Sequence, residues 1–175
     1  PPTFTTPVLD VPAVTSDATF SVQGDAEAES EVVVVVSGVV VGTVTPGAGG
    51  SWAFSVDLTA GTTDVQAQAR DALQNVSALS DPVSIVWDAE APQLTLATPA
   101  LETATPNLQP TFSGSATDVL SGIDPASVIL EIDSTPVGVI FDEAAGTFTY
   151  DAEAPFVTGS TILIRVAATD GAGNP

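Results

Sequence analysis

The sequence lacks cysteine, methionine, histidine and lysine, and its only basic residues are Arg70 and Arg165. These absences remove most catalytic nucleophiles, the usual general base, the amine of Schiff-base chemistry and the soft metal ligands. The remaining chemistry is that of oxygen, which favours hard cations such as Ca²⁺ over zinc, copper or iron. A glycosidase needs only two carboxylates, but no pair stands out in the sequence. We therefore predict that the protein is not an enzyme.

Positive charge is almost absent, since two basic and 22 acidic residues give a formal net charge of 2 − 22 = −20. Such a surface repels phosphate backbones, which excludes nucleic acid as a partner. It also disfavours anionic membrane surfaces. The longest purely apolar run, residues 32–36, is far shorter than the roughly 20 residues of a membrane-spanning helix, so no direct membrane insertion is expected.

The hydrophobic content of 44% is too high for a disordered acidic tail. Short runs of Val, Thr, Ile and Phe alternate with clusters of Gly, Pro, Asp, Asn and Ser, and no stretch has a helical period with caps, which predicts an all-β fold. The strands expected in the first half are Thr3–Leu9, Ala18–Gln23, Glu31–Ser37, Val39–Val44, Trp52–Asp57, Asp64–Asp71 and Val83–Trp87.

The second half of the chain repeats the order of the first. Four pairs of equivalent positions are Phe20 with Phe112, Trp52 with Phe148, Gly61 with Gly159 and Asp71 with Asp170. Their offsets are 92, 96, 98 and 99 residues. Offsets that grow in small steps indicate loop insertions in the second of two tandem modules. We place the boundary in residues 88–92, which gives modules at 1–88 and 89–175.

The second module ends without a counterpart of the strand Val83–Trp87. The expected fold is therefore two tandem immunoglobulin-like β-sandwich modules, the second lacking its final strand within this chain. A sandwich without that strand has an open sheet edge. Either further sequence or a neighbouring chain would supply the strand.

Several motifs resemble one known family. They are Trp52–Phe54, Leu58–Gly61, Val65–Asp71 and Asn75–Ser77 in the first module, Asp118–Val128, Gly146–Tyr150 and Ala168–Asn174 in the second, and the acidic, proline-ended connector Asp88–Pro92. They resemble the bacterial immunoglobulin-like modules, of Big and cadherin-like type, that occur in tandem in large surface adhesins and extracellular fibres. The resemblance covers nearly the whole chain and implies an extracellular, cell-surface location.

The resemblance also implies a cofactor, because carboxylates at the junctions of such modules often hold Ca²⁺. By position, it assigns Asp71, Asn75, Asp88 and Glu90 to the junction between the modules, and Asp170 and Asn174 to the next junction. Asp and Asn also accept backbone hydrogen bonds in turns without any metal, which is the alternative. Leu73 and Gln74 stand where the second module has Ala172 and Gly173, and this substitution weakens the expectation of a tight turn in the first module.

Residues 118–124 form another oxygen-rich segment, with Asp118, Ser121 and Asp124. Val119, Leu120 and Ile123 interrupt it, unlike the alternating ligands of an EF-hand. We interpret it as a turn that half-buries a Leu or Ile, with a cation loop as the alternative.

Trp52 and Phe148 occupy corresponding strand positions, and alternation along the strands favours core packing over a sugar-stacking platform. Trp87 is expected to pack against the junction instead. We therefore predict a mechanical function, in which the modules are non-catalytic spacers of a stalk, adhesin or fibre, stiffened by Ca²⁺. The expected partners are neighbouring modules or identical subunits. Two alternatives stay open, namely a filament subunit completed by a strand from the next subunit and an accessory region that binds a cell-surface or glycan ligand.

Overall fold

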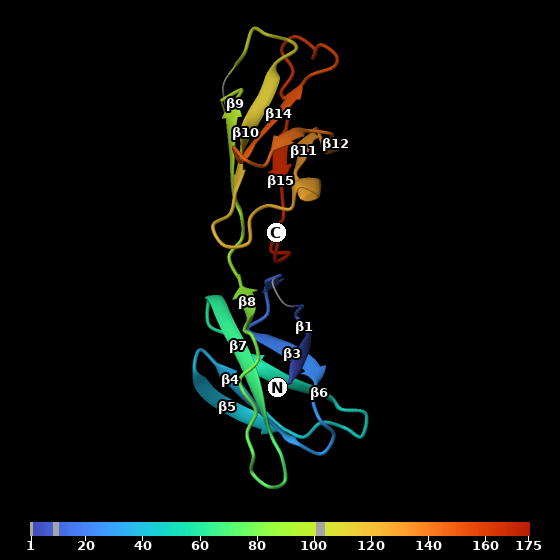
Figure 1. The fold of residues 1–175 in the computed structure, drawn as a ribbon. Helices are drawn as coiled ribbons and strands as arrows, with labels where there is room; N and C mark the ends of the chain where they lie inside the picture. The colour runs from blue at the N-terminus through green and yellow to red at the C-terminus, as the bar shows by residue number, and fades with distance from the viewer. Residues whose placement is uncertain (1, 9–10, 101–103) are drawn as a thin grey trace. The chain divides into compact units, whose positions relative to one another are not determined.

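The chain divides into two compact units, unit 1 at Pro1–Ala89 and unit 2 at Glu90–Pro175, one residue beyond the predicted boundary. The computed structural model describes residues 2–8, 11–100 and 104–175, and Figure 1 shows its strands. The end of the predicted strand Thr3–Leu9 lies outside these residues. Within the described residues, no helix is long and apolar enough to span a bilayer.

Unit 1 consists of two sheets (Figure 1). The smaller sheet has the order β1-β3-β6 and the larger one the order β2-β8-β7-β4-β5. The strands are β1 (Thr3–Thr6), β2 (Ala13–Thr15), β3 (Thr19–Asp25), β4 (Glu31–Val36), β5 (Val39–Val44), β6 (Ser51–Asp57), β7 (Gly61–Arg70) and β8 (Val83–Trp87). All pairs are antiparallel except that of β2 with β8.

Each expected strand of unit 1 has a counterpart in the structure. Val39–Val44 and Val83–Trp87 are found with the predicted bounds, whereas β7 begins at Gly61, three residues earlier than predicted. β2 is not among the strands expected from the sequence; it has three residues and pairs in parallel with β8 through Ala13↔Ile85. So short a strand has too few residues to show a period-two pattern, so only its tertiary partner defines it.

The core of unit 1 lies between its two sheets. Trp52 is 4% exposed and packs edge-to-face on Phe4 with ring centroids 5.4 Å apart, as predicted for a core aromatic. Trp87 packs against the same cluster, and its indole Nε1–H donates to the Ser16 carbonyl at 3.1 Å. Within unit 1, therefore, Trp87 is a half-buried member of the core and anchors the connection between β2 and β3.

Unit 2 repeats this plan with fewer strands (Figure 1). Its sheets have the orders β13-β14-β10-β9 and β12-β11-β15. The strands are β9 (Gln93–Thr98), β10 (Thr111–Thr117), β11 (Ile129–Ile132), β12 (Thr135–Val137), β13 (Ile140–Asp142), β14 (Thr147–Asp151) and β15 (Ile164–Ala167), with one 3₁₀ turn at Pro125–Ser127. The described residues hold no counterpart of β8.

The two units share a glycine–aromatic pairing between neighbouring strands. Gly24 lies opposite Trp52, and Gly114 lies opposite Phe148. A Cβ at either glycine would collide with the paired ring and with a backbone oxygen, of Thr3 in unit 1 and of Thr95 in unit 2. These glycines let a large ring lie flat across the sheet, and Phe148 is accordingly a buried core residue of unit 2.

Candidate metal centre

The Asp-x-x-x-Asn segment at the end of unit 2 is a compact turn organised by one carboxylate. Oδ1 of Asp170 accepts the amides of Ala172 at 2.9 Å and Asn174 at 2.8 Å, while Oδ2 accepts the Asn174 side-chain amide at 2.8 Å. Asp170 itself is 2% exposed. The turn therefore forms by hydrogen bonds alone, and the bound carboxylate is fixed in position.

Unit 1 contains the same turn at Asp71. Its Oδ1 accepts the amides of Leu73 at 2.8 Å and Asn75 at 2.9 Å, and its Oδ2 accepts the Asn75 side chain at 2.7 Å. Gln74 has φ +68° where Gly173 has φ +89°. The turn thus forms without glycine, although a left-handed backbone is uncommon for glutamine.

The structure corrects the predicted grouping of Asp71 and Asn75 with Asp88. Asp71 follows the last residue of β7, whereas Asp88 follows Trp87, which pairs with Gly61 at the first residue of β7. The length of β7 separates the two positions, about 30 Å at the usual rise per strand residue. Asp71 and Asn75 instead line the same surface hollow as Pro2, where the chain enters unit 1.

The same reasoning corrects the assignment of Asp170 and Asn174 to the following junction. Asp170 forms a β-bridge with Ile123, on the loop that follows β10. The last residue of β10, Thr117, pairs with Gln93, the first residue of β9. The turn at Asp170 is therefore at the end of unit 2 where the connector from unit 1 enters.

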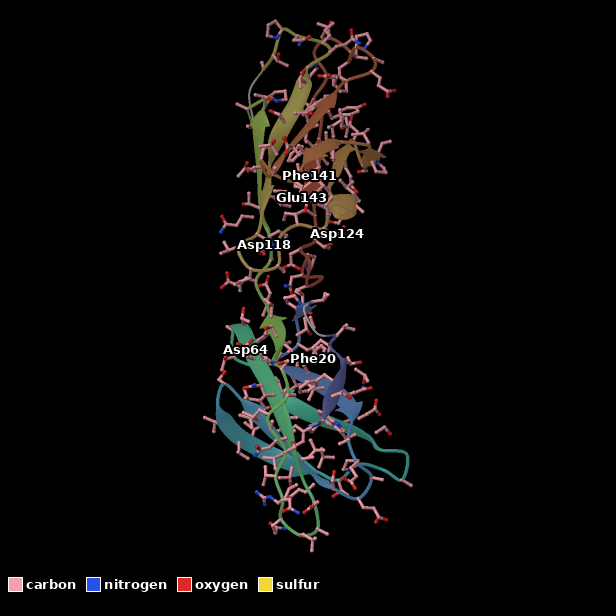
Figure 2. The ribbon with its side chains drawn as sticks, viewed as in Figure 1. Phe20, Asp64, Asp118, Asp124, Phe141 and Glu143 are labelled. Carbon is pink, nitrogen blue, oxygen red and sulfur yellow. The ribbon has the colours of Figure 1, made fainter. Side chains whose placement is uncertain are left out.

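Asp118 organises the loop after β10 (Figure 2). Its Oδ1 accepts the amides of Leu120 at 2.9 Å, Ser121 at 2.8 Å and Gly122 at 3.0 Å. Val119 points into solvent, while Ile123 is half-buried against the core. The predicted turn with a half-buried apolar residue is confirmed.

Hydrogen bonding lowers the pKa of two of these carboxyl groups. At Asp118, partial burial acts to raise the pKa, but the donated bonds from the amides of Ser121, Gly122 and Leu120 outweigh it, and the net pKa lies below the ordinary value. The side chain and backbone of Asn75 lower the pKa of Asp71. Both groups are therefore held as carboxylates at neutral pH.

Asp118 and Asp170 form a pair of carboxylates in unit 2. One oxygen of Asp118 lies within 4.8 Å of one of Asp170. Two backbone contacts fix the loops to each other, the Ile123–Asp170 bridge and a 2.9 Å hydrogen bond from the Gly171 amide to the Gly122 carbonyl. Two oxygens on one Ca²⁺, each at about 2.3–2.6 Å, lie at most about 5 Å apart, so this spacing fits one shared cation. From the sequence, residues 118–124 were expected to form a turn, with a cation loop as the alternative, but nothing in the sequence pairs Asp118 with Asp170.

The basic residues of the protein lie elsewhere. Arg70 forms an ion pair with Glu31 at 3.3 Å, and Arg165 forms one with Glu131 at 3.3 Å. Because the chain has no lysine or histidine, neither Asp118 nor Asp170 has a cationic side chain to offset its charge among the described ion pairs.

Asp88 and Glu90 lie on the connector. Asp88 is 1% exposed, and its amide donates to the Thr15 carbonyl at 2.9 Å, which continues the β2–β8 edge of unit 1. Glu90 is exposed and begins unit 2. Asp88 precedes the first residue of β9 by 93 − 88 = 5 positions.

Comparisons with known proteins show the fold. No protein-family model matches the sequence, and no curated protein matches it. The fibronectin(III)-like modules of Clostridium thermocellum CbhA match with a TM-score of 0.53 and 16% identity, over 99% of this chain and 87% of theirs. The protein is thus built like a tandem of fibronectin-III-like, immunoglobulin-like sandwiches. The central fibronectin-III array of RIM-binding protein matches over 89% of this chain and 65% of its own, at 13% identity and a TM-score of 0.28, which is too low to support a shared fold.

Proposed function

We propose that the protein is a pair of non-catalytic spacer modules from an extracellular, cell-surface stalk or fibre, and that Ca²⁺ stiffens the connection between them. The observation that supports this is the Asp118–Asp170 carboxylate pair at the end of unit 2 where the connector enters. The tandem sandwich architecture, which resembles CbhA modules, fits a spacer. The net charge of −20 gives the free chain a reason to bind cations.

The proposed cation has Asp118 and Asp170 as its first two ligands and Asp88 as its third. Asp88 lies five residues before β9, and five residues of chain span at most about 18 Å, so Asp88 would join the site through the short connector. Backbone carbonyls, water and Glu90 would complete the roughly six to eight oxygens that Ca²⁺ takes. Asn174 acts indirectly, because its side chain orients the Asp170 carboxylate.

Calcium-dependent unfolding tests this proposal. In EDTA and then across a Ca²⁺ titration, with Mg²⁺ as a comparison, the melting temperature of the protein should rise with Ca²⁺. Binding stabilises the folded state by about 2.7 kcal/mol at a hundredfold excess over Kd. Asp118→Asn and Asp88→Asn should each remove most of the rise, and calorimetric titration should show weaker Ca²⁺ binding.

Asp71→Asn is the matched control for Asp170→Asn. Both substitutions damage the same type of turn, but Asp71 lies at the far end of β7 from Asp88. Asp71→Asn should therefore keep the calcium response that Asp170→Asn loses. An unchanged melting temperature in Ca²⁺, or an equal loss in both variants, would contradict the calcium site.

NMR relaxation addresses the mechanical role separately. If Ca²⁺ stiffens the connector, the two units should share one anisotropic rotational diffusion tensor with Ca²⁺ and have separate tensors in EDTA. If Ca²⁺ binds but the two units keep separate diffusion tensors, the calcium site stands and the stiffening function is contradicted.

The indole positions argue against a glycan-binding role for the two tryptophans. Trp52 is buried in the core of unit 1, and Trp87 packs against that core with its Nε1–H bonded to Ser16. A ring buried as that of Trp52 is cannot stack on a sugar.

A further inference from the structure

The two carboxylates of unit 2 are held by loops that meet at one glycine. Asp118 Oδ1 accepts the amides of Ser121 at 2.8 Å and Gly122 at 3.0 Å, so this carboxylate follows the backbone of those residues. Asp170 is fixed in the same way by the turn that it begins. Gly171 is the next residue of that turn, and its amide donates to the Gly122 carbonyl at 2.9 Å. The contact at Gly171 therefore links the supports of both carboxylates.

There is no room for a side chain at Gly171. A Cβ at this position would lie 2.5 Å from the Ser121 carbonyl oxygen, whereas ordinary van der Waals contact begins at 3.4 Å. The obstacle is a backbone atom, which cannot rotate away as a side chain can. The two loops would have to move apart by close to 3.4 − 2.5 = 0.9 Å. Because Asp118 is hydrogen-bonded to Ser121, this movement would widen the spacing of the two carboxylates.

The turn itself does not need a glycine at this position. The equivalent turn of unit 1 has Ala72 there, and its carboxylate still accepts the amides of Leu73 and Asn75. Gly171 does not have a positive φ, so an alanine can adopt the same backbone conformation. The glycine is thus required only for the close approach of the loop at Ser121.

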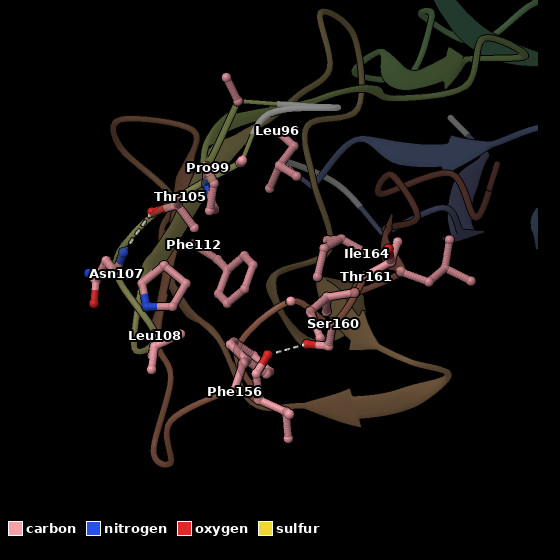
Figure 3. Close-up of a pocket in the computed structure, with 17 residues that line it drawn as sticks. Leu96, Pro99, Thr105, Asn107, Leu108, Phe112, Phe156, Ser160, Thr161 and Ile164 are labelled. Atoms are coloured by element: carbon pink, nitrogen blue, oxygen red, sulfur yellow. Dashed lines mark hydrogen bonds between the residues drawn. The ribbon is translucent and has the colours of Figure 1, made fainter.

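The other recess of unit 2 lacks ligands of this kind. It is an open hollow of about 670 Å³ whose lining includes Leu96, Phe112 and Ile164 (Figure 3). Among the described residues that line it, none has an acidic side chain. A hard cation that binds unit 2 is therefore expected at the Asp118–Asp170 pair and not in the hollow, because such ions favour carboxylate ligands.

We propose that Gly171 is a positioning residue that sets the size of the cation site, and with it the preference for Ca²⁺ over larger divalent cations. This inference rests on the proposed calcium function. Gly171 has no side-chain ligand, so it acts through the spacing of Asp118 and Asp170, which have one oxygen each within 4.8 Å of the other. Selectivity among hard cations depends on the size of the site and the rigidity of its ligands. A site widened at Gly171 should therefore lose more affinity for Ca²⁺ than for Sr²⁺, a larger ion of equal charge.

Gly171→Ala in the whole protein tests this role, with Gly138→Ala as the matched control. Gly138 also lacks a positive φ, and a Cβ on it would meet no atom within 4 Å. In calorimetric titrations, Gly171→Ala should weaken Ca²⁺ binding by about tenfold or more, the usual effect of losing a group that orients metal ligands. It should weaken Sr²⁺ binding less. Gly138→Ala should leave both dissociation constants unchanged.

Hydrogen exchange in EDTA measures the loop contact without any metal. In Gly171→Ala, the amide at position 171 should exchange faster than in the unsubstituted protein, because its hydrogen bond to Gly122 is lengthened. The amides of Ala172 and Asn174 should stay protected, because their hydrogen bonds to Asp170 belong to the turn.

The calcium function and the role of Gly171 fail in different ways. If the unsubstituted protein binds no Ca²⁺, the calcium function is contradicted and the role of Gly171 falls with it. If the unsubstituted protein binds Ca²⁺ but Gly171→Ala binds it equally well, or loses affinity for Ca²⁺ and Sr²⁺ in equal measure, only the role of Gly171 is contradicted. Loss of protection at the Ala172 and Asn174 amides would also contradict it, since alanine would then disrupt the turn itself.

Discussion

At the residue scale, three aspartates each organise one turn through hydrogen bonds to a carboxylate. Asp71, Asp118 and Asp170 each collect two or more backbone amides on one carboxylate oxygen. Because the bonds form to the charged group, they are stronger than bonds between neutral groups. In unit 2 this fixes two like charges side by side, an arrangement that repels itself unless a cation joins it.

Acid should remove the contribution of the Asp118 carboxylate to the stability of unit 2. A carboxyl with a lowered folded-state pKa stabilises the fold at any pH above its ordinary value of 3.8, and this stabilisation disappears as the pH falls through the folded-state pKa. In EDTA, Asp118→Asn should therefore lower the free energy of unfolding of unit 2 by about 1 kcal/mol at pH 7. At a pH below the folded-state pKa of Asp118, the Asp118→Asn variant and the unsubstituted protein should have the same free energy of unfolding.

Urea unfolding from pH 2 to pH 7, followed by NMR signals of unit 2, measures this difference. Glu143→Gln, on the exposed turn before β14, is the control and should match the unsubstituted protein at pH 7. A deficit in Asp118→Asn that stays constant to pH 2 would mean that the carboxylate charge has no role in the loop.

At the element scale, β8 determines the difference between the two units. In unit 1 it completes a five-stranded sheet, extends the pairing of β7 and holds β2. In the described part of unit 2 the corresponding sheet has three strands, and its core cluster has four buried hydrophobic residues against eleven in that of unit 1. The smaller core indicates that unit 2 is the less stable unit.

Shortening a buried side chain of β8 should lower the stability of unit 1. Ile85 is fully buried, and Ile85→Ala should cost about 2–5 kcal/mol because it leaves a cavity. Val39→Ala, in β5 at 64% exposure, should cost less than about 0.5 kcal/mol. Chemical denaturation followed by tryptophan fluorescence measures both, and equal effects would contradict the core role of β8.

Strand alignment between the units also depended on tertiary contacts. The sequence comparison equates Phe20 with Phe112, an offset of 92, but the glycine–aromatic pairs equate Gly24 with Gly114, an offset of 90. Phe112 therefore corresponds to the buried Val22 rather than to the half-buried Phe20. A slip of two residues keeps the same face inward, so the hydrophobic pattern cannot detect it.

At the scale of the whole molecule, each unit has its own core. Both tryptophans belong to unit 1, so tryptophan fluorescence reports the unfolding of that unit alone. Phe148→Ala should destabilise unit 2 by about 3–5 kcal/mol. In EDTA, the tryptophan transition should stay within about 0.5 kcal/mol of its original free energy, since distant sites act independently.

Circular dichroism should show the early loss of unit 2 in this variant, before the tryptophan signal changes. A tryptophan transition that moves together with unit 2 would show that the two units unfold as one cooperative body even without calcium.

The sequence by itself determined the all-β class, the two modules, their boundary to within one residue and most strands of unit 1. These features follow from local alternation, turn residues and internal repetition, which a single chain displays in one dimension. The tertiary structure decided which carboxylates meet. Asp71 and Asp88 are 17 residues apart in sequence but lie at opposite ends of β7, while Asp118 and Asp170 are brought together by a β-bridge between two loops. Spacing along the chain cannot give such contacts, because an antiparallel strand reverses the direction of the chain and only the register of its pairing fixes which ends coincide.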